Sequence, residues 1–282
     1  MKRSKTIALL LSCTLLLLTA GCGASPKPAP SAAPEVTSTP AVTTTPEPTA
    51  TPEPTPTATP EPMFTNPLTG EQTYTDYSQT RPVAIMVENN HWDDGTLIAQ
   101  GGLSQADIVY EMQVESITRN MFLFMDTDGL NNVFPIRSAR SYFVSAALSY
   151  DAIFAHCGKS GEGMEFADTM LVNYTDADDI EVHEGSCGFR QYDAPYFGAV
   201  HSMTTTGERL QDLFAQYGTR TTHRTDGYDY GLHFTEDAAP VNGEAAGSIR
   251  VVFPTNKITD FSYDAEKGGY TSTQWNSAST DG

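Results

Sequence analysis

The chain has 282 residues and a formal net charge of −19 at pH 7, because 35 acidic residues outnumber 16 lysines and arginines. Such an acidic surface repels nucleic acid and anionic lipid headgroups, and no basic stripe interrupts it, so we expect no nucleic-acid partner. The stretch from about 63 to 282 is long enough for one sizeable domain, or for one domain and part of a second.

The N-terminus has the features of an export signal. Lys2, Arg3 and Lys5 precede a largely apolar run over 7–18, and small residues follow this run. This order is typical of a signal peptide, and the run is shorter than the roughly 20 residues that a membrane-spanning helix needs. We therefore predict a removable signal over residues 1–21.

Residues 18–22, Leu-Thr-Ala-Gly-Cys, resemble the lipobox of bacterial lipoproteins, in which the cysteine is lipidated and becomes the first residue of the mature protein. We therefore expect lipidation at Cys22, membrane attachment through the lipid, and a position on the extracytoplasmic face of the cell membrane. Thr19 departs from the pattern, which prefers a larger aliphatic residue at that position. An ordinary secretory signal with an incidental cysteine is the alternative.

Residues 22–62 combine the predicted lipidated cysteine with a segment rich in proline, threonine, alanine and glutamate. Such a segment has little apolar surface to bury, so we predict that it is a disordered tether. Frequent proline favours extended polyproline II, and at roughly 3 Å per residue the tether would reach on the order of 100 Å.

The remaining chain alternates strand-like and helix-like patterns. Strands are predicted at 82–87, 106–112, 119–126 and 152–156, and again at 249–253, 258–263 and 270–275. Helices are predicted at 141–150, at 163–172 and after Thr204-Thr205-Thr206, where the apolar spacing continues to Tyr217 and Gly218 ends the helix. Asp126-Thr127-Asp128-Gly129 is typical of a turn.

Several stretches between 81 and 160 resemble one family in their order and spacing. They are Arg-Pro-Val-Ala-Ile-Met at 81–86, Gly-Leu-Ser-Gln-Ala-Asp-Ile-Val-Tyr-Glu at 102–111, Ile-Thr-Arg at 117–119, Pro-Ile-Arg-Ser-Ala-Arg at 135–140 and Tyr-Asp-Ala-Ile-Phe at 150–154. The sequence resembles the YerB-like lipoproteins, also called DUF3048, a family of uncharacterised function. A weaker likeness continues through His201-Ser202 to about 210. The resemblance implies a mixed, layered α/β core and attachment to the membrane as a lipoprotein, and it implies no established reaction.

The patterns and the resemblance together predict an α+β fold. We expect a layered mixed β-sheet with flanking helices over 63–225, followed by a β-rich C-terminal portion over 226–282. Asp281-Gly282 is a turn dipeptide that normally leads into another strand, so we expect this portion to be incomplete.

The most specific candidate site lies in a chain that has few basic residues. Arg137 and Arg140 stand three apart at the predicted start of a helix, where both side chains would share one face and Ser138 would cap it. Free N–H groups and guanidinium groups there suit a carboxylate or phosphate, and Arg119 would join them. The alternative is that these arginines are structural and pair with acids inside the fold. The candidate acids are Asp107, Glu111 and Glu115.

Cysteine and histidine chemistry is a weaker candidate. His156 and Cys157 are adjacent on a predicted strand and would point to opposite faces, so His156 is poorly placed to activate the thiol. A disulfide between Cys157 and Cys187 stays open, because sequence spacing does not fix the distance between them.

Metal and nucleotide sites are not expected. His183, Cys187 and His201 lack a zinc spacing, and in the loop that begins at Asp126 the glycine comes too early for calcium. Gly158-Lys159-Ser160 resembles the end of a P-loop, but Ile153 stands where the first glycine is required. We expect no metal and no cofactor.

Two functions remain open. The first is a cell-envelope binding or accessory module that recognises an anionic cell-wall component or a partner protein. The second is a surface hydrolase that acts on peptidoglycan with two carboxylates as acid and base. Its candidate residues are Glu88, Asp107 and Glu111, at predicted strand edges. The sequence does not decide whether the chain is an enzyme.

Overall fold

The computed structural model describes residues 63–90, 98–115, 117–159, 179–191, 201–235, 242–254 and 257–276. The predicted signal, Cys22, the tether and the predicted helix at 163–172 lie outside these residues. No helix in the described ranges is long and apolar enough to cross a membrane. The first described elements are two short strands, β1 (Phe64–Thr65) and β2 (Gln72–Thr73), which pair with each other.

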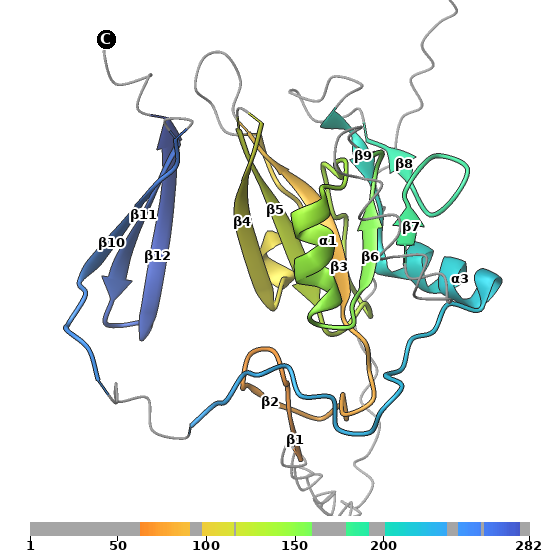
Figure 1. Cartoon of the computed structure of the whole chain (residues 1–282), viewed down its shortest axis with the longest axis horizontal. Helices are drawn as coiled ribbons and strands as arrows, with labels where there is room; N and C mark the ends of the chain where they lie inside the picture. The colour runs from red at the N-terminus through yellow and green to blue at the C-terminus, as the bar shows by residue number, and fades with distance from the viewer. Residues whose placement is uncertain are drawn as a thin grey trace, which may run out of the picture. The chain divides into compact units, whose positions relative to one another are not determined.

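A five-stranded mixed sheet forms the centre of this region (Figure 1). Its order is β4-β5-β3-β6-β7, in which β3, β6 and β7 are parallel and β4 and β5 are antiparallel to their neighbours. The strands are β3 (Val83–Asn89), β4 (Ile108–Val114), β5 (Ile117–Phe124), β6 (Ile153–His156) and β7 (Asp179–Glu181). Every residue of β3 is buried, which explains why its sequence is continuously apolar up to Glu88. The four strands predicted before residue 160 are confirmed.

Each face of the sheet packs against a helix. On one face, α1 (Ser141–Leu148) contributes Phe143 and Val144 to a core with Ala84 and Met86 of β3. On the other face, α3 (Gly207–Tyr217) buries its apolar side against the alternate residues of β3. The result is a layered core, consistent with the predicted α+β class.

The ends of α3 follow from its sequence. The side chain of Thr206 accepts a hydrogen bond from the N–H of Arg209, and Gly218 adopts a left-handed conformation with φ of 64° just after the last turn. Two short strands, β8 (Phe189–Arg190) and β9 (Met203–Thr204), pair antiparallel with each other, and β9 comes just before this helix in the chain. The predicted helix and its glycine stop are confirmed.

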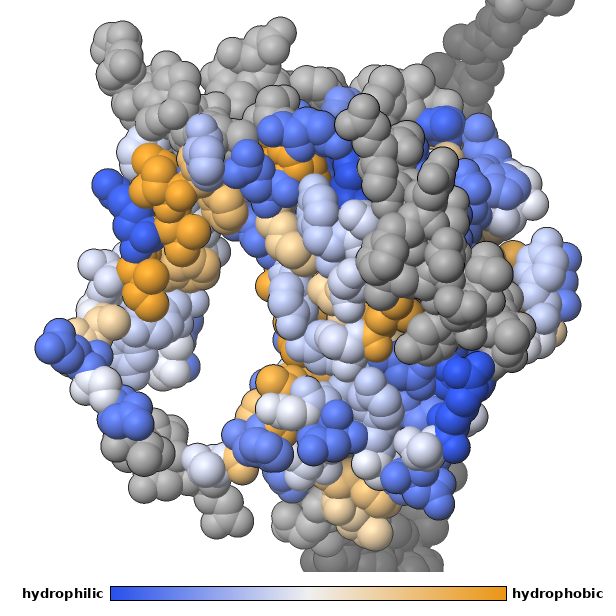
Figure 2. Space-filling model, in the orientation of Figure 1, coloured by the Kyte–Doolittle hydropathy of each residue, from blue (hydrophilic) through white to orange (hydrophobic). Residues whose placement is uncertain are grey.

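A separate three-stranded antiparallel sheet follows along the chain. It consists of β10 (Ser248–Val252), β11 (Lys257–Asp264) and β12 (Gly269–Asn276), as the strand pattern predicted. All five residues of β10 are exposed, and apolar side chains gather on the surface of this sheet (Figure 2). The exposed apolar residues here are Ile249, Val251, Val252, Tyr263 and Tyr270.

Candidate functional site: an arginine cluster around Glu88

The site lies at the carboxyl ends of β3 and β6, where a third segment enters between the two strands. β3 and β6 pair directly only from Val83 to Ile85 and from Ile153 to Ala155. Beyond that point the N–H of Arg137 donates to the carbonyl of Met86, and the N–H of Cys157 donates to the carbonyl of Arg137. The segment 136–139 therefore separates the two strands, and its side chains lie where open α/β sheets commonly bind ligands.

The expected helical start at Arg137 is wrong. The first residue of α1 is Ser141, and its N-cap is Arg140, whose backbone is extended. No side chain caps this helix, so Ser138 does not have the predicted capping role. The segment is extended because its backbone groups pair with the two neighbouring strands, and Arg137 and Arg140 do not share a helix face.

Two of the three arginines nevertheless converge on one backbone carbonyl, and Arg137 is the residue next to it in the chain. Nη1 of Arg119 donates to the carbonyl oxygen of Ser138 at 3.0 Å, and Nη1 of Arg140 donates to the same oxygen at 3.3 Å. Arg119 comes from β5, directly across from Glu88 of β3 in the strand register. The structure thus brings together all four predicted residues, Arg119, Arg137, Ser138 and Arg140, by a route other than a shared helix.

Glu88 is the acid at the centre of this arrangement. Its side chain is 0% exposed, its Oε2 lies 2.7 Å from Nε of Arg137, and the same oxygen lies 3.3 Å from Nδ1 of His201. We call Glu88, Arg119, Arg137 and His201 the Glu88 cluster. With neutral histidine, two guanidinium groups face one carboxylate, so the cluster has one excess positive charge inside a strongly acidic protein.

Hydrogen bonding in the Glu88 cluster is incomplete. Arg119 is 5% exposed, and its Nε has no hydrogen-bond partner among the residues that the structure describes. Both carboxylate oxygens of Glu88 lack a hydrogen bond of good geometry despite the close approach of Arg137. Buried polar groups without partners are costly and uncommon in folded proteins, so each needs an explanation.

Burial also changes the pKa values in this cluster. It lowers the pKa of the Arg119 guanidinium to about 10; Glu88 opposes this change, while Arg140 and Arg137 add to it. Arg119 therefore still carries its charge at neutral pH. Burial lowers the pKa of the His201 imidazole, Glu88 acts in the opposite direction, and Arg137 lowers the pKa further. His201 is accordingly neutral near pH 7.

Of the ion pairs expected if the arginines are structural, the one between Arg140 and Glu115 is present. Nε and Nη2 of Arg140 bind the two carboxylate oxygens of Glu115 at 2.7 and 2.9 Å. Arg137 pairs with Glu88, which was not among its expected partners. Of the other acids, Asp107 accepts from the N–H of Met125 and from Asn66, while Glu111 accepts from Asn89 and Thr118.

The cysteines and histidines do not form a nucleophilic pair. Nε2 of His156 contacts Oδ1 of Asp179 at 2.5 Å and Nδ1 contacts the carbonyl of Gly158, so both ring nitrogens are used away from Cys157. Burial raises the pKa of the Cys157 thiol, although Arg190 and Arg137 partly oppose this rise.

The structure also bears on the disulfide and on metal binding. Cys157 and Cys187 are both free thiols, so they do not form the disulfide that the sequence left open. Among the described residues, no group of three or more His, Cys, Asp or Glu could hold a metal ion.

Sequence reasoning missed Glu88 and His201 as members of one cluster with the arginines. One signal was visible for Glu88, because a carboxylate that directly follows the apolar run 82–87 on a buried strand needs a cationic partner. His201 offered no comparable signal, since it reaches Glu88 only through the fold.

Comparisons with known proteins agree with this fold. Residues 68–220 match the N-terminal domain of DUF3048, a family described as proteins of unknown function. YerB of Bacillus subtilis (strain 168), which is named as a lipoprotein, is 32% identical over 209 residues, or 73% of this chain and 58% of YerB. The chain thus spans less than two thirds of that relative. The chain is also similar to the crystal structure of YerB protein from Bacillus subtilis, with a TM-score of 0.59 and 28% sequence identity. The match covers 75% of this chain and 67% of the chain in that crystal structure. The chain belongs to the DUF3048, YerB-like family.

Proposed function

We propose that this protein is a lipid-anchored, extracytoplasmic binding module that recognises an anionic group of a cell-wall component or partner protein at the Glu88 cluster. The lipid anchor is supported by the lipobox-like sequence around Cys22 and by the name of its relative YerB as a lipoprotein. The binding role is supported by the arginines at the carboxyl ends of the parallel strands.

The observation that carries the proposal is the incomplete hydrogen bonding of the buried, charged Arg119 side chain. Its guanidinium is buried and charged, Arg137 and Arg140 repel it, and its Nε has no hydrogen-bond partner in the described part of the chain. An incoming carboxylate or phosphate oxygen would supply the missing acceptor and balance the excess charge of the cluster. The energy lost in leaving Arg119 incompletely bonded would then be recovered on binding.

A hydrolase that uses paired carboxylates has less support. Two of the three carboxylates expected for it, Asp107 and Glu111, accept hydrogen bonds that tie together neighbouring parts of the fold. Glu88 is fully buried and faces cations, whereas the acid–base chemistry needs a second carboxylate at the same cleft.

Calorimetric titration of the full chain with inorganic phosphate and with acetate, at low ionic strength, tests the binding role. We expect saturable binding of at least one anion, weakened about 10- to 100-fold in Arg137→Ala, since a hydrogen bond to a charged group contributes about 1.5–3 kcal/mol. Arg250→Ala is the matched control, because Arg250 is exposed and pairs with Asp260 on the C-terminal sheet. Equal weakening in both variants, or no anion binding at all, would contradict the proposal.

The anchor is tested separately in cells. Labelled fatty acid should be incorporated into the wild-type chain and not into Cys22→Ser, and the variant should leave the membrane fraction. If Cys22→Ser retained the label, the lipid would be attached at another residue, and the proposed anchor at Cys22 would be wrong.

A further inference from the structure

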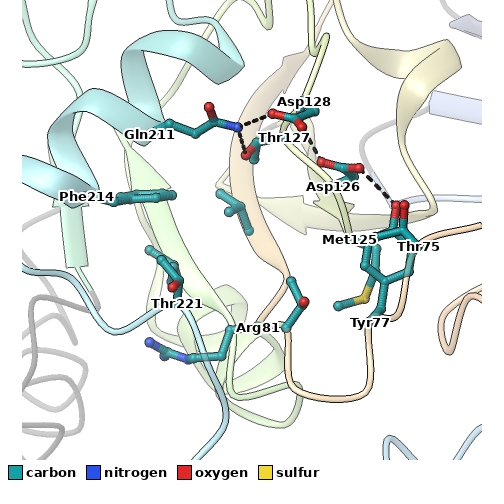
Figure 3. Close-up of a pocket in the computed structure, with 13 residues that line it drawn as sticks. Thr75, Tyr77, Arg81, Met125, Asp126, Thr127, Asp128, Gln211, Phe214 and Thr221 are labelled. Carbon is teal, nitrogen blue, oxygen red and sulfur yellow. Dashed lines mark hydrogen bonds between the residues drawn. The ribbon is translucent and has the colours of Figure 1, made fainter.

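A pocket lies at the opposite end of the central sheet from the Glu88 cluster (Figure 3). Its volume is about 330 Å³, and Val83 and Ile153, the first residues of β3 and β6, line it together with Met125 after β5. Glu88 lies five residues farther along β3, which corresponds to roughly 17 Å of strand. The pocket is therefore a separate place in the molecule, and it falls within the usual size range for small ligands.

One wall of the pocket is a hydrogen-bonded polar network that joins three parts of the chain (Figure 3). The hydroxyl of Tyr77 donates to Oδ2 of Asp126 at 2.9 Å, and the N–H of Asp128 donates to Oδ1 of the same carboxylate at 2.7 Å. From α3, Nε2 of Gln211 donates to Oγ1 of Thr127 at 3.1 Å and to Oδ1 of Asp128 at 2.7 Å. These bonds fix the side chains in position before any ligand arrives.

The network leaves several polar atoms available to a ligand. Neither Oδ2 of Asp128 nor Oε1 of Gln211 has a hydrogen-bond partner in the described parts of the chain, and the hydroxyl of Thr127 keeps its proton for donation because it accepts from Gln211. Other hydroxyl groups, among them that of Thr221, also line the pocket. Buried apolar side chains complete the lining, with Phe214 on the side of α3 and Met125 beside Tyr77 (Figure 3).

We propose that this pocket binds an uncharged, polyhydroxylated ligand, namely a single sugar ring of a larger glycan. Hydroxyl groups both donate and accept hydrogen bonds, so they match a ligand whose own groups do the same. The fixed carboxylate and amide oxygens accept hydrogen bonds from the ring hydroxyls, and the apolar side chains of the lining contact the C–H groups of the ring. A mixed lining of this kind is usual for small-molecule sites.

Other ligand classes fit the pocket less well. An anion would meet the carboxylates of Asp126 and Asp128, and the buried guanidinium of Arg81 already faces the carboxylate of Asp151 at 3.4 Å. A metal ion would find only two acids, both oxygens of Asp126 being already hydrogen-bonded. The hydroxyl groups give a sugar more partners than they give a cation.

Titration of the full chain with uncharged trisaccharides of N-acetylglucosamine and of glucose, followed by calorimetry, tests the pocket. We expect saturable binding of at least one, weakened about 3- to 10-fold in Gln211→Ala and in Asp128→Asn, since Gln211 makes neutral hydrogen bonds of moderate strength and asparagine at position 128 keeps one acceptor oxygen. Gln216→Ala and Asp212→Asn are matched controls on the exposed side of α3 and should bind as the wild type does.

The outcome is independent of the anion site. Arg137→Ala should retain sugar binding, so loss of anion binding alone would leave this proposal intact, and loss of sugar binding alone would leave the proposed function intact. Failure of both sugars to bind, equal weakening in the control variants, or binding of calcium or ammonium ions in place of sugars would overturn it.

Discussion

Two buried clusters at opposite ends of the central sheet each hold arginines around one carboxylate, and they differ in how completely their hydrogen bonds are formed. In the second cluster, Arg81, Asp151, Arg220 and His223, Arg220 binds both oxygens of Asp151 at 2.7 and 2.9 Å. His223 contacts Asp151 at 2.8 Å through Nδ1 and the hydroxyl of Tyr230 at 2.7 Å through Nε2. We call these four residues the Asp151 cluster.

The comparison shows that two clusters with the same kinds of charged groups differ in how fully those groups are hydrogen-bonded. Each cluster contains two arginines, one acid and one histidine. In the Asp151 cluster every nitrogen of Arg81 donates to a backbone carbonyl, whereas in the Glu88 cluster Nε of Arg119 finds no hydrogen-bond partner within the described ranges. We infer that the Asp151 cluster stabilises the fold, whereas the Glu88 cluster is the one for which we propose a ligand.

The largest expected effect is the loss of the Asp151 carboxylate. Asp151→Ala would leave Arg81, which is 3% exposed, and Arg220 without their shared acid. Removing one partner of a buried ion pair costs about 3–5 kcal/mol, so we expect the free energy of unfolding in urea to fall by this amount. Asp212→Ala, on the exposed side of α3, is the control. An equal, small change in both variants would show that the Asp151 cluster does not stabilise the fold.

Acid should also reduce the contribution of the Asp151 cluster to the free energy of unfolding, by less than the Asp151→Ala substitution does. Burial by itself would raise the pKa of Asp151, but hydrogen bonds from Arg220 and His223 and the charge of Arg81 outweigh it and lower the pKa. Because the folded pKa is below the unfolded value of about 3.9, the contribution to stability is complete above that value and is lost as the pH falls through the folded pKa. The protonated carboxyl group keeps some hydrogen bonds, so the loss is smaller than in Asp151→Ala.

Urea unfolding of the wild type and of Asp151→Asn between about pH 5 and pH 2 measures this effect. The midpoint of the wild type should fall more steeply with acid than that of the variant. Parallel curves would mean that Asp151 is not the group whose protonation destabilises the fold.

The two clusters also show what the sequence could and could not predict. The buried strand β3 and the helix α3 were predictable because each depends on local features, a continuous apolar run in one and a threonine cap with a glycine stop in the other. The extended segment 136–139 was not predictable, because long-range backbone bonds to Met86 and Cys157 override its helix-like pattern.

The same reason limits prediction of the site. Arg119, Arg137 and Arg140 were recognisable as candidates because arginine is scarce in this chain. The convergence of Arg119 and Arg140 on the carbonyl of Ser138, and the approach of Glu88 to Arg137, depend on how β3, β5 and the inserted segment meet. Short strands such as β7 and β8 have too few residues to show a period.

A ligand that completes the Glu88 cluster should stabilise the folded chain. At a phosphate concentration of ten times Kd, mass action predicts a gain of about 1.4 kcal/mol in the free energy of unfolding. We expect this gain in the wild type and in Arg220→Lys, which alters the Asp151 cluster, and not in Arg137→Ala. A gain that persists in Arg137→Ala but disappears in Arg220→Lys would assign the anion to the Asp151 cluster and reverse the comparison.

The smallest expected effect on stability is that of Arg119→Met, and it separates the two kinds of cluster most directly. Methionine fills much of the same space without a charge that must be desolvated, and replacing a poorly bonded buried ion by an apolar residue is often neutral or stabilising. We therefore expect the free energy of unfolding to stay within about 1 kcal/mol of the wild-type value, while phosphate no longer stabilises the chain. A loss of about 3–5 kcal/mol, as in Asp151→Ala, would show that Arg119 supports the fold as Arg81 does. In that case incomplete hydrogen bonding would not mark a binding site in this protein, and the proposed function would lose its main support.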